Sequence, residues 1–327
     1  MDLSLPDWPM FGLAEDMRPA MRAAITANQP AALVTLHTVQ GGGPRPPGAQ
    51  MLLSAGAASG FLSGGCVEGD IAVHAAEVVE DGQLRQLVYG EGGPWPDIRL
   101  LCGARIEILV ERVAPDDPAI TELLAMGEAR RPAVYVTDGR VRRVEPAPNH
   151  RPADCRIRAE PFELRRLYEP VPRLVVIGAD PIALATASLA AQAGFETTLV
   201  RPKGPETPPP LAGVAYSRAE PEEALATIGL DPWTAVAVAT HDWDTDQAGL
   251  LAALPSAAAY VGVLGARRRL PERLMRLRAA GIDEAALGRL HAPIGLDLGG
   301  KAPWEVAVSV IAQIIAQRPR GAGEAEA

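Results

Sequence analysis

The segment of the sequence best suited to chemistry is Ser63-Gly64-Gly65-Cys66-Val67-Glu68-Gly69-Asp70, which leads into a predicted helix. Gly64 and Gly65 allow neighbouring backbone N–H groups to converge into an anion-binding nest where that helix starts. Cys66 is expected in the first helical turn, which favours the thiolate and makes the sulfur a better nucleophile or soft metal ligand. Glu68 would complement the helix dipole. The alternative for Cys66 is a small buried thiol, the commoner fate of a free cysteine.

Two further loops of the first half carry candidate binding residues. Arg45 lies in the run Gly41–Gly48, whose glycines and prolines exclude helix and strand. Cys102 precedes Gly103 and a predicted strand, so its thiol either lines the same cleft as Cys66 or packs. The chain has three cysteines and no CxxC pair, which argues against a zinc site and against a disulfide framework.

In the second half, candidate residues follow apolar runs that are predicted to be parallel strands, whose carboxyl ends bind ligands in open sheets. His241 and Asp242 follow one such run, and Arg267 follows another. Arg267 begins a predicted helix with two more arginines, where positive charge opposes the helix dipole and is better explained by a bound anion. The alternative is three solvated arginines. His241 and Asp242 could join Asp246 as metal ligands, but no third firm ligand has suitable spacing.

The turn Gly178-Ala179-Asp180-Pro181-Ile182-Ala183 stands where a dinucleotide-binding domain has its phosphate loop. Asp180 replaces the glycine that lets backbone approach a pyrophosphate, and we expect it to cap the following helix with Pro181 behind it. Its carboxylate would then occupy the place of a phosphate. Arg201 replaces the ribose-binding acid, although it could meet a 2′-phosphate. We therefore expect no ordinary NAD site, and an NADP-dependent oxidoreductase stays as the alternative function.

Two domains must position these residues, since 327 residues are many for one core. The first domain, residues 1–168, is predicted to be mixed α+β. Its expected elements are strands 32–39, 51–54, 60–63, 84–89 and 104–113, helices 67–80 and 119–129, a hairpin around 138–139 and a charged, proline-containing linker over 146–172. Cys155 falls in that linker and is given no role.

The second domain, residues 169–327, is predicted to be a Rossmann-like, doubly wound parallel sheet. Continuous apolar strands that alternate with helices are typical of that α/β architecture. The expected strands are 174–177, 197–200, 235–239 and 259–264, and the expected helices are 181–193, 247–254, 271–280 and 303–317.

Composition excludes several classes of function. The formal charge of −9 argues against non-specific nucleic-acid binding, which needs clustered Lys and Arg. No segment has the pattern of a signal peptide, and no apolar run is long enough to span a bilayer. We expect a soluble protein of the reducing cytoplasm, because the cysteines are too few for disulfides.

Several segments taken in order resemble the XdhC/CoxI family over about residues 30–317. The matching segments are GGGPRPPGAQM at 41–51, SGGCVEG at 63–69, LCG at 101–103, THD at 240–242, YVGVLG at 260–265 and PIGLDLG at 293–299, followed by Pro303 and Glu305. The sequence departs from the family where Gly42 and Gly43 replace common serines. Ala104 replaces a glycine, and Ala266 replaces a serine.

The resemblance implies an accessory protein without turnover chemistry, which binds mature molybdenum cofactor (molybdopterin), protects it and delivers it to a molybdenum hydroxylase such as xanthine dehydrogenase. It further implies a cysteine desulfurase partner that sulfurates the cofactor, and a homodimer. A purely structural subunit of a hydroxylase complex is a third hypothesis. The chain lacks the iron–sulfur cysteine sets of the hydroxylases themselves.

The resemblance also implies roles for the candidate residues. Cys66 would face the molybdenum as its ligand from the protein, and Gly64, Gly65 and Arg45 would hold the pterin phosphate. The remaining cofactor-binding residues implied are Glu68, Cys102, His241, Asp242 and Arg267.

Overall fold

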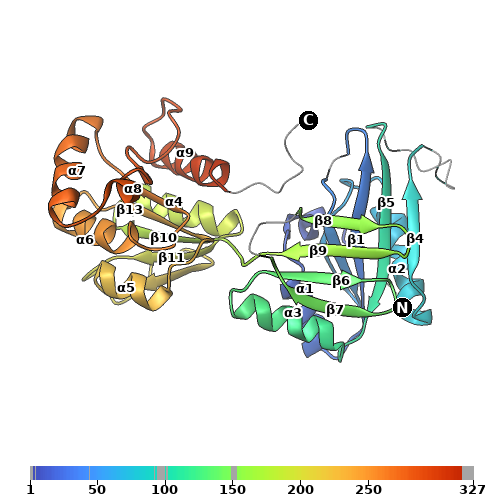
Figure 1. The fold of residues 1–327 in the computed structure, drawn as a ribbon. Helices are drawn as coiled ribbons and strands as arrows, with labels where there is room; N and C mark the ends of the chain where they lie inside the picture. Colours follow the sequence, from blue (N-terminus) through green and yellow to red (C-terminus); the bar gives the residue numbers. More distant parts are fainter. Residues whose placement is uncertain are drawn as a thin grey trace. The chain divides into compact units, whose positions relative to one another are not determined.

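The computed structural model describes residues 3, 5–43, 45–91, 93, 100, 102–148 and 153–318. The chain divides into two compact units at the junction of Pro170 and Val171 (Figure 1). Each unit has its own hydrophobic cores, so the two are described separately. No helix in the described ranges is both long and apolar enough to cross a bilayer.

The first unit is mixed α+β, as predicted, and its described part holds two antiparallel sheets. The five-stranded sheet has the order β3-β2-β1-β5-β4 and the four-stranded sheet the order β7-β6-β9-β8. The strands are β1 (Ala31–Gln40), β2 (Gln50–Ser54), β3 (Ala57–Gly60), β4 (Arg85–Tyr89), β5 (Arg105–Val113), β6 (Ala133–Thr137), β7 (Arg142–Pro146), β8 (Cys155–Arg158) and β9 (Glu163–Tyr168). The helical segments are η1 (Pro9–Leu13), α1 (Arg18–Thr26), α2 (Glu68–Asp81) and α3 (Pro118–Glu128).

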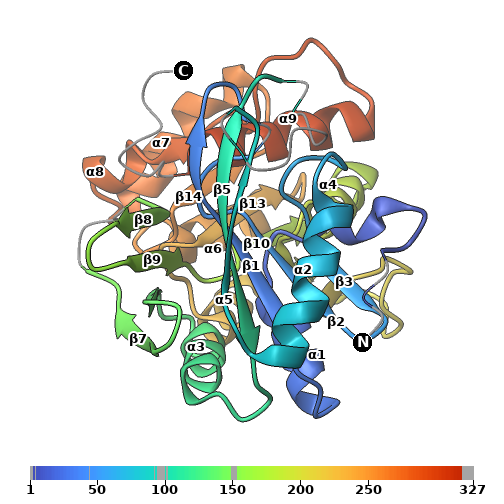
Figure 2. The same ribbon diagram turned by 90° about the vertical axis from the view of Figure 1, so that its right-hand side faces the viewer.

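Both faces of the five-stranded sheet pack against other elements, because β1 carries apolar side chains on both of its faces. Alternate residues such as Val34 and Leu36 pack against α2 (Figure 2). Leu33 packs instead into a second core formed with α1, α3 and the four-stranded sheet. The α2 helix ends at Asp81, and the next residue, Gly82, has a left-handed φ of 71° that suits glycine. The sheet is therefore a rigid frame for the loops at its ends.

Two predictions for the first unit are wrong. The linker predicted over 146–172 contains β8 and β9, which pair with each other, and β9 also pairs with β6, so that they complete the four-stranded sheet. The charged residues that suggested a linker form cross-strand ion pairs on the sheet surface, such as Arg143 with Glu163 at 3.0 Å. The strand predicted over 60–63 ends instead at Gly60, since β2 and β3 are joined by a tight turn at 55–56.

The second unit is the predicted Rossmann-like sheet, with all six strands parallel in the order β12-β11-β10-β13-β14-β15 within the described residues. Alternate residues of β10 face opposite helical layers, and Val176 packs toward α4 and α9 while Ile177 packs toward α5 and α6. The strands are β10 (Arg173–Gly178), β11 (Glu196–Val200), β12 (Val214–Ser217), β13 (Thr234–Ala239), β14 (Tyr260–Val263) and β15 (Leu290–His291). The helical segments are α4 (Pro181–Gln192), α5 (Pro221–Ile228), α6 (Trp243–Ala253), η2 (Arg267–Arg269), α7 (Leu270–Ala279), α8 (Glu284–Leu287) and α9 (Pro303–Ala316).

Four short elements of this unit, β12, α5, α8 and β15, are not among those predicted from the sequence. The α6 helix begins at Trp243, four residues before the predicted start at Gln247. Asp242 caps this helix by accepting a hydrogen bond from the amide of Thr245 at 2.8 Å. The acidic residues behind His241 therefore belong to the first turn of a helix and not to a loop.

Candidate functional site

Three of the predicted loop segments lie at one end of the five-stranded sheet. At this loop end β1, β3 and β4 finish while β2 and β5 begin, because neighbouring strands are antiparallel. The loop Gly41–Gly48 follows β1, the segment Phe61–Val67 follows β3, and Cys102 precedes β5. The first and third segments approach closely, since a Cβ on Gly41 would lie 3.6 Å from the carbonyl oxygen of Gly103.

The amide groups of the glycine loop converge, as predicted, but they converge on the side chain of Glu68. This residue is 3% exposed. Gly64 and Gly65 adopt φ values of +84° and +111°, which let successive N–H groups point inward. The donors to the Glu68 carboxylate are the amides of Leu62, Ser63, Gly64, Gly65 and Val67, at 2.6–3.3 Å, and the hydroxyl of Ser63 at 2.5 Å.

Glu68 therefore takes the place that the sequence analysis gave to a phosphate. Burial alone would raise the pKa of its carboxyl, but hydrogen bonds from the Ser63 hydroxyl and the loop amides outweigh burial and lower that pKa. The carboxylate is anionic at neutral pH and holds the loop from within. Its predicted role as a partner of the helix dipole is the smaller part of what it does.

The prediction that Cys66 lies in the first helical turn is wrong, because Cys66 precedes the helix. The N-cap of α2 is Val67, and the amide of Cys66 donates to the Ser63 hydroxyl at 3.0 Å. Its thiol is exposed rather than buried, and so is that of Cys102. By contrast, burial raises the pKa of the Cys155 thiol to about 12. The two thiols at the loop end are thus the ones that can meet a ligand.

Arg45 is joined to the glycine loop through Phe61. Its guanidinium lies 4.8 Å from the centre of the Phe61 ring, and it forms an ion pair with Glu15. The Nε atom of Arg45 is buried and has no hydrogen-bond partner among the described residues. The Glu15 side chain is 65% exposed to solvent, so its ion pair with Arg45 is weak. An anion that binds Arg45 can therefore displace Glu15.

A cavity of about 580 Å³ lies beside the glycine loop. The start of α2 with Glu68 lines it together with the N-terminal segment and Phe61. The residues that line it are Leu5, Pro6, Asp7, Pro9, Phe11, Gly12, Leu13, Phe61, Gly64, Gly65, Glu68 and Gly69. Its size is within the range of small-molecule sites, and its mixture of apolar walls with a few polar groups is typical of them.

Sequence reasoning missed the N-terminal wall of this cavity. Residues 1–10 served only to exclude a signal peptide, although Leu5 and Phe11 are apolar residues set among prolines. Both pack against the core between the five-stranded sheet and α2. That pattern is too short to identify as helix or strand, and only the fold brings it to the glycine loop.

In the second unit, the strand order places a topological switch point between β10 and β13, where open α/β sheets bind ligands. Asp180 caps α4 there, as predicted, by accepting a hydrogen bond from the amide of Ala183 at 2.8 Å. Its other carboxylate oxygen lies 2.8 Å from Nε2 of His241. His241 has a left-handed φ of +61°, an unusual conformation for a residue other than glycine. The phosphate position of a dinucleotide is thus filled by a carboxylate.

The metal site considered for His241, Asp242 and Asp246 is not formed. Asp242 caps α6, and Asp246 forms a buried ion pair with Arg273 at 2.9 Å. His241 faces Asp180 instead. In the part of the chain that the structure describes, no three His, Cys, Asp or Glu side chains are grouped so that they could hold a metal ion.

Arg267 follows β14, as predicted, but its side chain is 78% exposed and lies 3.5 Å from the equally exposed Asp297. Arg201 directly follows β11, at the position of a ribose-binding residue. The predicted residues thus form two groups. Cys66, Cys102 and Arg45 gather with the glycine loop in the first unit, whereas His241, Asp242 and Arg267 belong to the second.

Comparison with known proteins covers both units. A model described as the XdhC and CoxI family matches residues 24–90, and one described as the XdhC Rossmann domain matches residues 174–314. The chain is similar to the molybdenum cofactor insertion chaperone PaoD of Escherichia coli (strain K12), with 31% identity over 310 residues, 94% of this chain and 90% of that protein.

Two further proteins are similar over most of their length. A probable xanthine dehydrogenase subunit of Bacillus subtilis (strain 168) is 26% identical over 332 residues, covering 91% of this chain and 96% of that protein. A crystal structure described as a xanthine dehydrogenase from Bacillus halodurans has a TM-score of 0.71 and 24% identity, covering 92% of this chain and 95% of that one. At that identity the last comparison shows a shared fold.

Proposed function

This chain belongs to the XdhC and CoxI family, and we propose on that basis that it binds molybdenum cofactor and serves its insertion into a molybdenum hydroxylase. The names of two relatives, a cofactor insertion chaperone and a probable xanthine dehydrogenase subunit, support this role. The observation that carries the proposal is the cavity beside the glycine loop, whose lining includes Gly65, the chain neighbour of the exposed Cys66.

The cavity suits the pterin part of the cofactor. Its volume of about 580 Å³ accommodates a fused ring system. Phe11 and Phe61 offer flat apolar surfaces against which such a ring can stack. Asp7 adds a carboxylate to the lining, which can accept hydrogen bonds from ring N–H groups. Since the Glu68 carboxylate already accepts hydrogen bonds from the loop, it shapes the wall rather than binding the ring.

We assign the sulfur chemistry of the site to Cys66. Soft thiolate ligands suit a metal that is itself bound by sulfur, and the cofactor when bound supplies such a metal. The backbone of Cys66 is fixed by its hydrogen bond to Ser63, while the thiol stays exposed beside Gly65 of the cavity wall. Cys102 offers a second exposed thiol at the same end of the sheet.

We assign the pterin phosphate to Arg45 and not to the glycine loop. The loop amides donate to Glu68, so they are not available to a phosphate without displacing that side chain. Arg45 contacts Phe61 of the cavity lining, and its partner Glu15 is exposed enough to be displaced by a phosphate. Glu68 therefore contributes by ordering the loop, and Gly64 and Gly65 by letting it fold around Glu68.

The finer parts of the role are also proposed here. The chain protects the cofactor, receives it in sulfurated form with a cysteine desulfurase as partner, delivers it as a cytoplasmic homodimer and has no turnover of its own. An oxidoreductase using NADP is the competing function. Asp180 disfavours it, since the carboxylate stands where the pyrophosphate would bind. Calorimetric titration with NADPH separates the two functions, because the competing one requires measurable heat at millimolar nucleotide.

The test of the cofactor site is the molybdopterin content of protein purified from cells that make the cofactor. We expect Cys66→Ala to retain about tenfold less cofactor per chain, which corresponds to roughly 1.4 kcal/mol. Cys155→Ala is the matched control, because its thiol is less exposed than that of Cys66 and its raised pKa disfavours the thiolate. Equal content in Cys66→Ala and wild type would remove Cys66 from the site, and absence of cofactor from wild type would refute the proposed function.

A further inference from the structure

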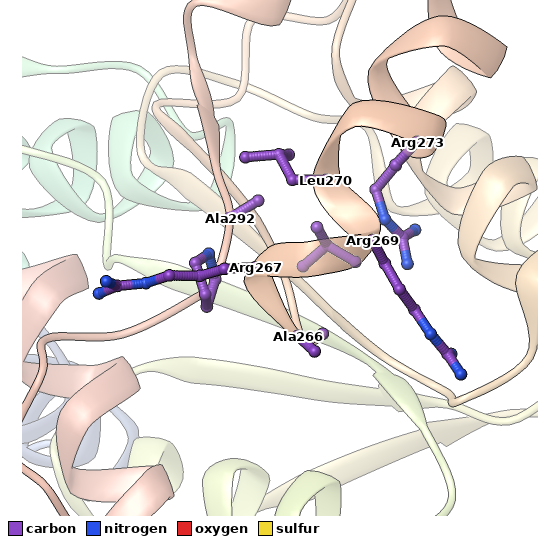
Figure 3. Close-up of a pocket in the computed structure, with 9 residues that line it drawn as sticks. Ala266, Arg267, Arg269, Leu270, Arg273 and Ala292 are labelled. Carbon is purple, nitrogen blue, oxygen red and sulfur yellow. The ribbon is translucent and has the colours of Figure 1, made fainter.

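A small hollow lies at the carboxyl end of β14 in the second unit (Figure 3). It has a volume of about 10 Å³, room for one water-sized group. Its charged lining comes from Arg267, Arg269 and Arg273, and its apolar lining includes Leu270 and Pro293. The hollow is distinct from the cavity of the first unit, so a ligand bound in it would be independent of the proposed cofactor role.

Arg273 brings an unsatisfied buried charge to this hollow. The residue is 5% exposed, and its Nη2 donates to Asp246 at 2.9 Å. Its Nη1 is buried and has no hydrogen-bond partner among the described residues. A buried donor on a charged group is costly to leave unpaired, so a fixed guanidinium with one free nitrogen indicates an acceptor that binds there.

Arg269 adds a second positive charge on the same side. In Figure 3 its side chain extends in the same direction as that of Arg273, whereas Arg267 extends the opposite way. Both guanidinium groups lie over the ring of Trp243, at 4.8 Å for Arg273 and 5.8 Å for Arg269. Arg269 has no ion pair among the described residues, while Asp246 neutralises Arg273 alone.

The contrast with Arg276 shows that the ring alone does not explain the arrangement. Arg276 also lies over Trp243, at 4.7 Å, but it is paired with Glu272 at 2.7 Å and does not line the hollow. Three like charges around one ring repel one another, and Arg269 and Arg273, which line the hollow, have only one acid between them, Asp246. An anion that bridges Arg269 and Arg273 would remove this repulsion.

We propose that the hollow binds a phosphate monoester, with one oxygen seated against Nη1 of Arg273 and the remaining oxygens reached by Arg269. The hollow admits a single oxygen, so the rest of the group stays at its open mouth. The unbalanced charge of Arg269 and the unpaired nitrogen of Arg273 together suit a phosphate group, because its several oxygens can accept hydrogen bonds from both guanidinium groups. This assignment replaces Arg267, the residue that the sequence analysis chose for an anion.

The test is calorimetric titration of the full-length protein with inorganic phosphate and with glycerol phosphate at constant ionic strength, with Trp243 fluorescence as a second readout. We expect both probes to bind. Arg269→Ala should weaken each by about tenfold through loss of a charge-assisted contact. Arg273→Lys should do the same while keeping the charge that pairs with Asp246, and its melting temperature shows whether it is folded.

Arg276→Ala is the matched control, since it removes the same charge from the same ring without touching the hollow. Its affinities for both probes should lie within about twofold of those of wild type, because the only expected effect is the loss of a surface charge that salt screens. Tighter binding of glycerol phosphate than of inorganic phosphate would identify an esterified ligand, and equal binding would identify free phosphate. Three results would each overturn the proposal. The first is no binding at about 20 mM probe, which is far above the range of specific anion sites. The others are equal affinities in wild type and Arg269→Ala, and a loss of affinity in Arg276→Ala equal to that in Arg269→Ala.

Discussion

Replacement of Glu68 by alanine tests whether its carboxylate holds the glycine loop together. The wild-type carboxylate accepts hydrogen bonds from amides of the loop and from the Ser63 hydroxyl. In Glu68→Ala these donors lose their acceptor all at once. Donors at the exposed Gly64 and Gly65 can turn to water, but the amides of Leu62 and Ser63 are buried and cannot.

The expected cost follows from those two stranded donors. Each buried amide without an acceptor costs about 1–3 kcal/mol, so the free energy of unfolding of the first unit should fall by roughly 2–6 kcal/mol. Urea denaturation followed by circular dichroism measures that fall. Hydrogen exchange of the amides over 62–67 gives the local readout, since they should lose their protection in the variant. Added acetate should restore part of both, because it offers a carboxylate to the vacated donors.

The same carboxylate predicts a pH dependence. The folded-state pKa of Glu68 lies below its ordinary value of 4.5. Its contribution is therefore fully present above pH 4.5 and is lost as the pH falls through the folded-state pKa. Glu68→Gln should lack this component of acid destabilisation. Glu80→Gln, which changes an exposed residue of the same helix, is the control. If Glu68→Ala unfolds at the same urea concentration as wild type, the assignment of the loop to Glu68 is refuted.

Three other outcomes follow from close contacts. Gly178→Ala should destabilise the second unit by about 2 kcal/mol or more, seen as a lower melting temperature, because its Cβ would lie 2.5 Å from the carbonyl oxygen of Ala239. Cys155 should react with a thiol reagent at about pH 8 only after unfolding, since burial raises its pKa to about 12, whereas two fast thiols are expected in the native protein. His241→Gly should relieve the strain of the left-handed backbone at position 241, although it also removes the contact with Asp180. The melting temperature of this variant should therefore be no lower than that of wild type, and a clear fall would contradict this expectation.

The parts of the fold that the sequence predicted are those set by local pattern. The run of apolar residues 174–177 identified a buried parallel strand, and Asp180 before Pro181 identified a helix start, and both predictions are confirmed. The strand β9 was hidden because its solvent face carries charged residues that meet partners on another strand. Their pairing is visible only once β7 and β9 lie on either side of β6 in one sheet.

The candidate site was predicted as a set of segments but not as a geometry. An acid after a glycine loop suggests a helix dipole partner, and nothing local indicates that the Glu68 side chain turns back to Leu62. The contact between Asp180 and His241 joins positions 61 residues apart in the chain. Arg269 and Arg267 have the same residue type and neighbouring positions, so only their side-chain directions separate them.

Glu68 and Asp180 each place a carboxylate against the amides at the start of a helix, and this affects which anions from solution can bind there. Each is tethered within a few residues of the helix start that it occupies, so it competes with outside ligands as an intramolecular partner. The effective concentration of such a tethered group exceeds by orders of magnitude the millimolar phosphate of a cell. Neither helix start can therefore be filled by abundant phosphate or nucleotide, so each is closed to the small metabolites that outnumber a rare cofactor.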